Sequence, residues 1–393
     1  MSATTTEPEA PDTTRAGTGH LVELEGLRAA AAFAVLLTHA GFLSGAVGRD
    51  ILPGFLARMD IGVPIFFVLS GFLLYRPHAR AVLGNLPAPA LRTYAVRRAA
   101  RLVPAWLLVL LGTLALVPES RTASKGAWVA NLLQVQSLRN EWDLPGLAQL
   151  WSLSTEAMFY VALPLLAWVI ARRVKGRGAR AHLLALAGVA LAAWTFRVVV
   201  ALDWLPSGIS WLRTLPATGD WFVVGMVLAV VTTDQALHAR AQRVVQAVPW
   251  HLYAAAAVVF WLLTTRAAGP YDLSAPTSAQ HWVKHLGYTV VGALVVAPSV
   301  LGARTALSRV LRWGPVTYLG RISYGVFLWH MPLMFAIRRM LGLSIFTGGF
   351  WITVVLTTLA AVAVSALSWH LVEERVQRWS HRRTRSSAPQ HGG

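Results

Sequence analysis

The chain has 393 residues, of which 55% are hydrophobic and only 13% charged, with a formal net charge of +18 and no cysteine. A soluble domain carries about a quarter charged residues, so this composition excludes an ordinary soluble protein. The missing cysteine excludes disulfides, thiolate metal ligands and a cysteine nucleophile. The positive charge lies between apolar blocks, which indicates membrane topology and no nucleic-acid partner. We expect no metal site.

In chain order, residues 1–20 come first and are polar and rich in threonine and proline, which predicts a disordered N-terminal tail. They lack the basic start and the cleavage site of a signal peptide, so the first apolar block should be retained as a helix. Residues 21–372 form the predicted transmembrane domain, and residues 373–393 a basic C-terminal tail.

The apolar blocks are about 15–25 residues long, the length that a helix needs to cross hydrocarbon, and they do not alternate as the strands of a membrane barrel do. The sequence therefore predicts an all-α, polytopic integral membrane protein with about ten transmembrane helices. The predicted spans are 21–42, 61–75, 102–118, 151–171, 183–202, 221–233, 249–265, 286–301, 316–337 and 345–371. The spans 61–75 and 221–233 are short, and either is interpreted as a crossing or as a re-entrant segment.

The distribution of basic residues predicts the topology. With the N-terminus in the cytoplasm, the inner segments hold 21 lysines and arginines and the outer segments hold 10. Because cytoplasmic loops carry an excess of basic residues, both termini are expected to be cytoplasmic.

The first span carries Arg28 and His39. Ionisable groups inside a membrane helix usually face a protein interior or a wet cavity and mark a functional path. Eleven residues separate the two, which is about three full turns, so both lie on one face about 16 Å apart. This helix is predicted to present a cation near the inner side and a neutral-pH base nearer the outer side.

Four further clusters place polar residues within or beside the apolar blocks. They are Ser70-Gly71 within Phe66–Phe72, the arginines of Arg97–Pro104, Glu156 and Tyr160 in Trp151–Tyr160, and Arg321, Ser323, Tyr324 and His330 within Gly320–Pro332.

These motifs, in this order, resemble the acyltransferase-3 family of bacterial membrane O-acyltransferases over about residues 21–379. The arginine, ten residues and histidine from Arg28 to His39 look like the family's opening motif. One departure is that Glu373 is not followed two residues later by proline, so we assign it no catalytic role. An appended extracellular hydrolase-like domain, which some relatives carry, is not expected.

The resemblance implies an enzyme of the bacterial plasma membrane that takes an acyl group from acyl-coenzyme A, most simply acetyl-coenzyme A. The acceptor would be a hydroxyl of a carbohydrate, a cell-surface glycan or a secondary metabolite. The sequence leaves the acceptor, the acyl chain length and the oligomeric state open. A transporter of a glycan or metabolite without acyl-transfer chemistry is the alternative, although no internal repeat supports it.

The catalytic candidates are His39 and Glu156. Imidazole accepts and releases protons near neutral pH, so His39 is the predicted base for the acceptor hydroxyl, either for direct attack or through a transient acyl-histidine. Glu156 would orient His39 or neutralise an intramembrane arginine such as Arg28 or Arg197. The alternatives are a structural histidine and a purely structural ion pair.

Arg28, Arg98 and Arg101 are the candidates for binding the anionic donor. Their alternatives are snorkelling to headgroups for Arg28 and a topology signal for Arg98 and Arg101.

The remaining candidates have substrate-binding or structural roles. Ser70, with Gly71, is interpreted as a close-packing site in preference to a nucleophile, because its own motif offers no base. His330 precedes Pro332, whose missing N–H frees a backbone carbonyl, so His330 would bind substrate or that carbonyl. The others in this class are Tyr160, Arg321, Ser323 and Tyr324.

Overall fold

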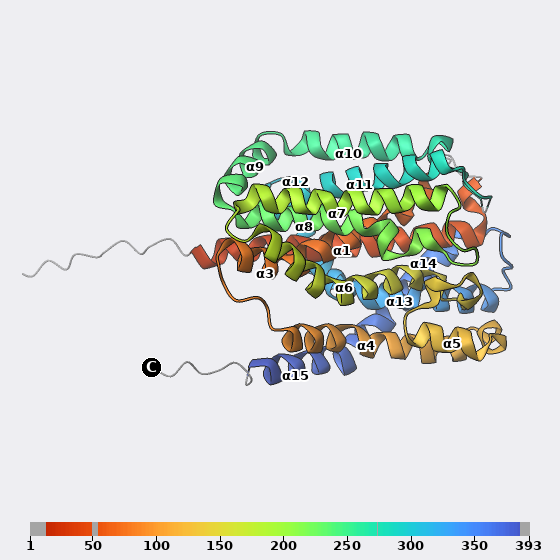
Figure 1. Cartoon of the computed structure of the whole chain (residues 1–393). Helices are drawn as coiled ribbons and strands as arrows, with labels where there is room; N and C mark the ends of the chain where they lie inside the picture. Colours follow the sequence, from red (N-terminus) through yellow and green to blue (C-terminus); the bar gives the residue numbers. More distant parts are fainter. Residues whose placement is uncertain (1–12, 49–53, 273, 386–393) are drawn as a thin grey trace, which may run out of the picture.

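The computed structural model describes residues 13–48, 54–272 and 274–385, and every regular element in these ranges is a helix. The long helices run side by side along one axis, as Figure 1 shows from the side of the bundle. The predicted all-α class is therefore confirmed. Residues 1–12 and 386–393 of the two predicted tails lie outside the described residues.

The helices follow one another along the chain with short turns and longer loops between them. Their bounds are α1 (Thr13–Ser44), α2 (Phe55–Arg58), α3 (Gly62–Leu83), α4 (Leu91–Leu116), α5 (Lys125–Leu132), α6 (Trp151–Val174), α7 (Gly178–Ala201), α8 (Leu215–Thr233), α9 (Gln235–Ala247), α10 (Pro249–Leu263), α11 (Ser278–Val300), α12 (Ala306–Leu311), α13 (Gly314–Met340), α14 (Phe350–Ser368) and α15 (Glu374–Arg385). A π-helical turn, Trp369–Glu373, joins α14 to α15.

Among the described residues, eight stretches are long and apolar enough to cross a membrane. The pair α9 and α10, bent by 77°, adds a ninth if it forms one broken span. Each of the ten predicted blocks falls on a helix, and the arrangement fits a multi-pass membrane protein. The two short blocks belong to full-length helices, since α3 has 22 residues and α8 has 19. Nineteen residues span about 29 Å at 1.5 Å per residue, close to the hydrocarbon thickness.

The third span begins earlier than the apolar pattern predicts. The block was expected from residue 102, but α4 starts at Leu91 and continues through Pro104. Arginine is a good helix former, so the basic cluster extends the helix and does not precede it. Arg98 and Arg101 therefore share one helix face, one turn apart.

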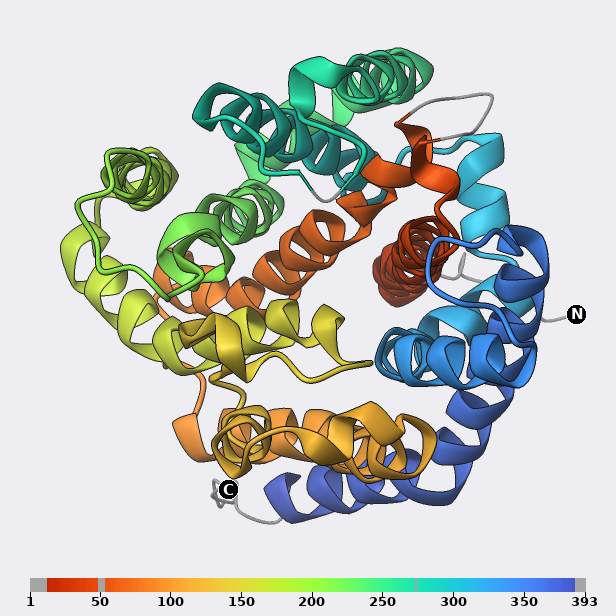
Figure 2. The ribbon, with the colours of Figure 1, turned by 90° about the vertical axis from the view of Figure 1, so that its right-hand side faces the viewer.

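The bundle has two ends, and Figure 1 distinguishes them. α1 begins and α15 ends at the end where α9 lies, which we call the terminal end. α5 lies at the other end, which we call the loop end and which faces the viewer in Figure 2. In that view α1 is enclosed by other helices, and it packs along α13, α3 and α14.

Glycines let these helices approach closely. A Cβ at Gly320 of α13 would lie 2.0 Å from the carbonyl oxygen of Glu25 in α1. A Cβ at Gly71 of α3 would lie 2.1 Å from the carbonyl oxygen of Phe222 in α8, and one at Gly225 would lie 2.0 Å from that of Val68. Small residues at such contacts are the usual means of helix association in membranes.

We predict that Gly71→Ala destabilises the protein, because the added methyl group overlaps the α8 backbone. Overpacking of this kind costs about 1–3 kcal/mol. The measurement is the thermal unfolding midpoint of purified protein in detergent. Gly188→Ala is the matched control, since a Cβ at that position of α7 would meet no side chain and no other helix of the described residues within 4 Å. Equal midpoints for the two variants would contradict the close packing of α3 on α8.

Candidate active site

A cavity of about 360 Å³ lies between α1, α3, α4, α6 and α13. We call it the main cavity. Seven residues singled out in the sequence line it, namely Arg28, Ser70, Arg98, Arg101, Glu156, Tyr160 and Tyr324. Much of its remaining wall is apolar and includes Val63, Phe66, Phe67 and Phe327. A largely apolar cavity with a few convergent polar groups is the usual form of a ligand site.

The charged groups of the main cavity come from three helices. α1 supplies Arg28, whose side chain is 11% exposed and lies 3.8 Å from Glu25. α4 supplies Arg98 and Arg101, and α6 supplies Glu156. Three guanidinium groups thus face two carboxylates, which leaves the cavity suited to an anionic ligand.

Glu156 is held by two hydroxyl groups. Ser70 Oγ donates a hydrogen bond of 2.5 Å to Glu156 Oε1, and the Tyr160 hydroxyl donates to the same oxygen. The Tyr94 hydroxyl in turn donates to the Tyr160 carbonyl at 3.1 Å. A carboxylate from another helix therefore stands next to Ser70, although the sequence around Ser70 offered no base.

His39 takes its orientation from α13 and not from Glu156. Its Nδ1 lies 3.1 Å from Nε2 of His330 and 2.9 Å from the Val35 carbonyl oxygen. The centroids of the two imidazole rings are 5.1 Å apart. His330 is fully buried, and His39 is half-buried. The predicted pairing of Glu156 with His39 is not made, since Glu156 bonds Ser70 and Tyr160.

The carbonyl groups around the histidines fix their tautomers. A carbonyl oxygen only accepts, so the ring nitrogen that faces it must carry the proton. Nδ1 of His330 faces the Val326 carbonyl at 3.2 Å, and Nδ1 of His39 faces that of Val35. In the neutral pair, the Nδ1–H of His39 is shared between the Val35 carbonyl and Nε2 of His330, which both accept from it. Nε2 of His39 then holds a lone pair and has no hydrogen-bond partner within the described residues, as a general base requires.

The histidine pair lies next to the main cavity without lining it. Phe327, a wall residue of the main cavity, has its ring 5.8 Å from that of His330 and 5.9 Å from that of Phe66. One layer of aromatic rings therefore stands between the cavity and the histidine pair.

Pro332 leaves a carbonyl free in α13, as the sequence predicted, but His330 does not take it. The helix continues through Pro332 to Met340. The carbonyl four residues earlier, that of Leu328, accepts a 3.0 Å hydrogen bond from Nε2 of the buried Gln149. The side chain of His330 is thereby left to contact His39.

The other α13 candidates lie outside the main cavity. Ser323 is buried, and its hydroxyl has no hydrogen-bond partner in the described structure. Arg321 is exposed and lines a small pocket of about 40 Å³ together with Arg101, Tyr324 and Glu373. Glu373 is buried on the π-helical turn and accepts a 2.7 Å hydrogen bond from Ser368. It stands beside Arg101 and not in the main cavity.

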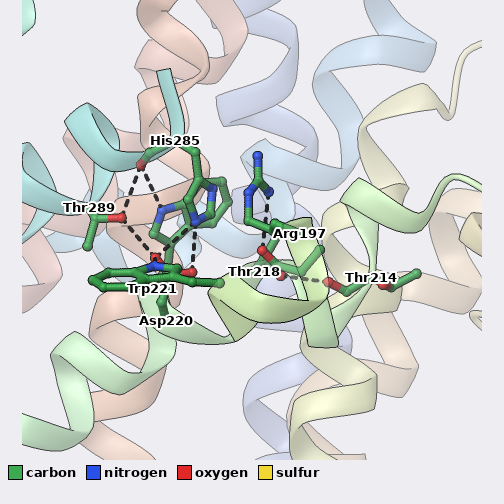
Figure 3. A network of polar contacts seen from close by, with 9 residues as sticks. Arg197, Thr214, Thr218, Asp220, Trp221, His285 and Thr289 are labelled. Atoms are coloured by element: carbon green, nitrogen blue, oxygen red, sulfur yellow. Dashed lines mark hydrogen bonds and ion pairs between the residues drawn. The ribbon is translucent and has the colours of Figure 1, made fainter. Parts of the chain in front are cut away.

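A second polar centre, which sequence reasoning did not assign, joins α7, α8 and α11 (Figure 3). Both carboxylate oxygens of Asp220 lie 2.9 Å from Nε2 of His285, and Thr289 and Trp194 donate to Oδ2 at 3.0 and 3.1 Å. Asp220 is 1% exposed and His285 3%. The sequence signal was a single carboxylate at the start of an apolar run, a pattern that marks a buried polar group.

The chain belongs to the acyltransferase-3 family, because the family's acyltransferase domain matches residues 21–370. The chain therefore carries the acyltransferase domain of this family, and the family assignment made from the motifs is confirmed. No solved structure matches it.

Several bacterial proteins are similar to the chain. The peptidoglycan O-acetyltransferase OatA of Listeria monocytogenes is 26% identical over 93% of this chain and 57% of its own length. The putative peptidoglycan O-acetyltransferase YrhL of Bacillus subtilis is 27% identical over 90% and 54%. The O-acetyltransferase OatA of Staphylococcus aureus is 25% identical over 80% and 51%. The chain thus spans about half the length of these relatives.

We predict that Glu156→Ala destabilises the protein, because it leaves the hydroxyls of Ser70 and Tyr160 without their acceptor. A buried polar group that loses its partner costs about 1–3 kcal/mol. Thermal unfolding in detergent measures this loss. Glu141→Ala serves as the control, since the Glu141 side chain is 69% exposed. An unfolding midpoint for Glu156→Ala as high as that of the control would show that Glu156 does not hold α3 to α6.

Proposed function

We propose that the chain is an O-acyltransferase of the bacterial plasma membrane that moves an acyl group, acetyl in the simplest case, from acyl-coenzyme A to an acceptor hydroxyl. The observation that carries the proposal is the contact between His39 and His330, which leaves Nε2 of His39 without a partner in the described residues, one layer of aromatic rings from a cationic cavity. A base for the hydroxyl and a site for an anionic donor are two requirements of acyl transfer from a thioester.

The proposed orientation places the terminal end of the bundle in the cytoplasm. The segments on that side hold 21 basic residues, against 10 on the other. Arg98 lies near the start of α4, and Arg28 near the start of the first span. The donor would enter from this side.

The arginines would bind the phosphate groups of the donor. Guanidinium groups pair with phosphate oxygens through charge-assisted, often bidentate hydrogen bonds. Arg98 and Arg101 would lie at the cytoplasmic entrance of this site, with Arg28 deeper in the cavity. Arg28 and His39 are about 16 Å apart along α1, so Arg28 binds a different part of the donor from the thioester that His39 serves.

The chemical step uses His39 as the base. Nε2 of His39 takes the proton from the acceptor hydroxyl while that oxygen attacks the thioester carbonyl. The carbon–sulfur bond then breaks, and the departing thiolate takes the proton from the imidazolium. An ester and free coenzyme A result. His330 is a positioning residue, because its Nε2 accepts from Nδ1–H of His39 and keeps Nε2 of His39 unprotonated.

Phe66 and Phe327 would turn aside when the acyl end of the donor reaches the histidine pair. Their edge-to-face contact closes the main cavity toward His330. Exclusion of water at this point protects the thioester from hydrolysis.

The acceptor is proposed to be a carbohydrate hydroxyl of the cell envelope. The names of the relatives support this class, since two of them are described as peptidoglycan O-acetyltransferases. A secondary metabolite remains the other acceptor to test. A transporter would consume no acetyl-coenzyme A with any acceptor, and that result would overturn the proposal.

We predict that His39→Ala lowers the rate of acyl transfer about 10²–10⁴-fold, the usual contribution of a general base. The measurement is release of free coenzyme A from acetyl-coenzyme A by purified protein with a cell-wall glycan acceptor. His251→Ala is the matched control, because His251 is exposed on α10. Wild-type activity in a folded His39→Ala protein would remove His39 from the mechanism. If Ser70→Ala were inactive at the same time, a serine acyl-enzyme would replace the direct transfer proposed here.

We predict that Arg98→Ala raises the KM for acetyl-coenzyme A about tenfold with a smaller change in kcat, because it removes a phosphate contact made before the chemical step. Arg97→Ala is the control on the same helix, since Arg97 bonds Thr384 at 3.1 Å and does not line the main cavity. Equal KM values for the two variants would place donor binding elsewhere.

A further inference from the structure

A second cavity of about 760 Å³ lies at the loop end, between α3, α6, α7, α8, α11 and the segment 203–213. We call it the loop-end cavity. Val63 lines both cavities, and Phe67 of the main cavity contacts two tryptophans of the loop-end cavity, Trp221 at 5.9 Å and Trp151 at 6.4 Å between ring centroids. The two cavities therefore adjoin across a thin partition of side chains.

The wall of the loop-end cavity combines aromatic rings with hydrogen-bonding groups. The aromatic residues are Trp151, Trp211, Trp221 and Tyr288. Such walls provide large rigid contact surfaces for a ligand with both apolar and polar faces. A sugar ring has both kinds of face, since its C–H groups and its hydroxyls point in different directions.

Apart from Arg197, most of the charged side chains that line this cavity are already paired. Lys284 Nζ lies 2.6 Å from Asp60 Oδ2, and Arg213 Nη1 lies 3.1 Å from Asp143 Oδ2. His285 lies against Asp220, whose two oxygens accept from three donors, namely His285, Thr289 and Trp194.

Arg197 is the exception. Its side chain lies beside the Asp220 cluster in Figure 3, and it donates to a backbone oxygen, that of Ala217, at 3.2 Å. It is only 5% exposed, and its guanidinium carbon lies 5.4 Å from the centre of the Trp282 ring. Within the described residues its Nε has no hydrogen-bond partner, and it makes no ion pair with a carboxylate. Asp203, which also lines the cavity, is exposed and makes no ion pair with it.

A buried guanidinium with unused donors would be stabilised by an acceptor from outside. Arginine has five N–H donors in a planar fork, and a buried donor without a partner costs about 1–3 kcal/mol. Asp220 offsets part of the charge of Arg197 at longer range, but its oxygens are occupied. A ligand oxyanion in the loop-end cavity would satisfy these donors.

We infer that the loop-end cavity binds the acceptor and that Arg197 binds a carboxylate group of an acidic sugar. This inference rests on the proposed function and orientation, which make the loop end the outer face, where an envelope glycan is found. One unpaired guanidinium matches a singly charged carboxylate, whereas a phosphate monoester carries about −1.5 to −2. An acceptor seated here would present its hydroxyl to the partition at Val63, on the far side from the donor.

The test is a binding titration without donor, with wild-type protein in lipid nanodiscs and two matched sugars. N-acetylmuramic acid carries the carboxylate, and its methyl ester lacks the charge. We expect the acid to bind at least about tenfold more tightly than the ester, because a bidentate charge-assisted pair is lost in the ester. Arg197→Gln should bind both sugars equally, and Arg213→Gln should keep the preference, because Arg213 is already paired with Asp143.

Equal binding of acid and ester by the wild type, an undiminished preference in Arg197→Gln, or saturable binding of neither sugar would each overturn the inference. If Arg197→Gln does not fold, Arg197→Lys replaces it, and its preference should fall below that of the wild type because the fork is lost. The titration uses no acyl donor, so its outcome is independent of acyl transfer. Failure of the proposed function would appear instead as absence of acetyl-coenzyme A consumption.

Discussion

The architecture depends on one constraint, which is that polar groups on membrane helices must find partners inside the protein. In hydrocarbon there is no water to bond an exposed donor or charge, so an ionisable side chain on a span is turned inward. α1 carries two such groups and lies within the bundle. Glu25 lies next to Arg28, and His330 of α13 bonds His39.

Close backbone contacts make these side-chain contacts possible. Gly320 lets α13 approach α1 at Glu25, and α13 carries His330 ten residues later along the same helix. Gly71 lets α3 lie against α8, while its neighbour Ser70 reaches Glu156 on α6. Gln149 occupies the carbonyl that Pro332 frees, so α13 remains a continuous helix at the histidine pair. The glycines and prolines of the motifs thus position the polar residues that accompany them.

The helices and most of the charged residues of the main cavity could be predicted from the sequence, because both follow from local patterns. Apolar blocks of membrane length marked ten of the helices, and ionisable residues within or beside them marked Arg28, Arg98 and Glu156. The partners could not be predicted, because they come from distant parts of the chain. His330 lies 291 residues from His39, and Ser70 lies 86 residues from Glu156. The apolar pattern also missed the start of α4, since arginines interrupt hydropathy without interrupting the helix.

The most direct measurement of the central claim is a cryo-electron microscopy structure of the wild-type chain in lipid nanodiscs with a thioether analogue of acetyl-coenzyme A. The account predicts phosphate density beside Arg98 and Arg101, with the thioether sulfur at the Phe327 end of the main cavity, next to His39. The account would be contradicted if the density for the analogue lay at the loop end, or if its thioether sulfur lay far from His39.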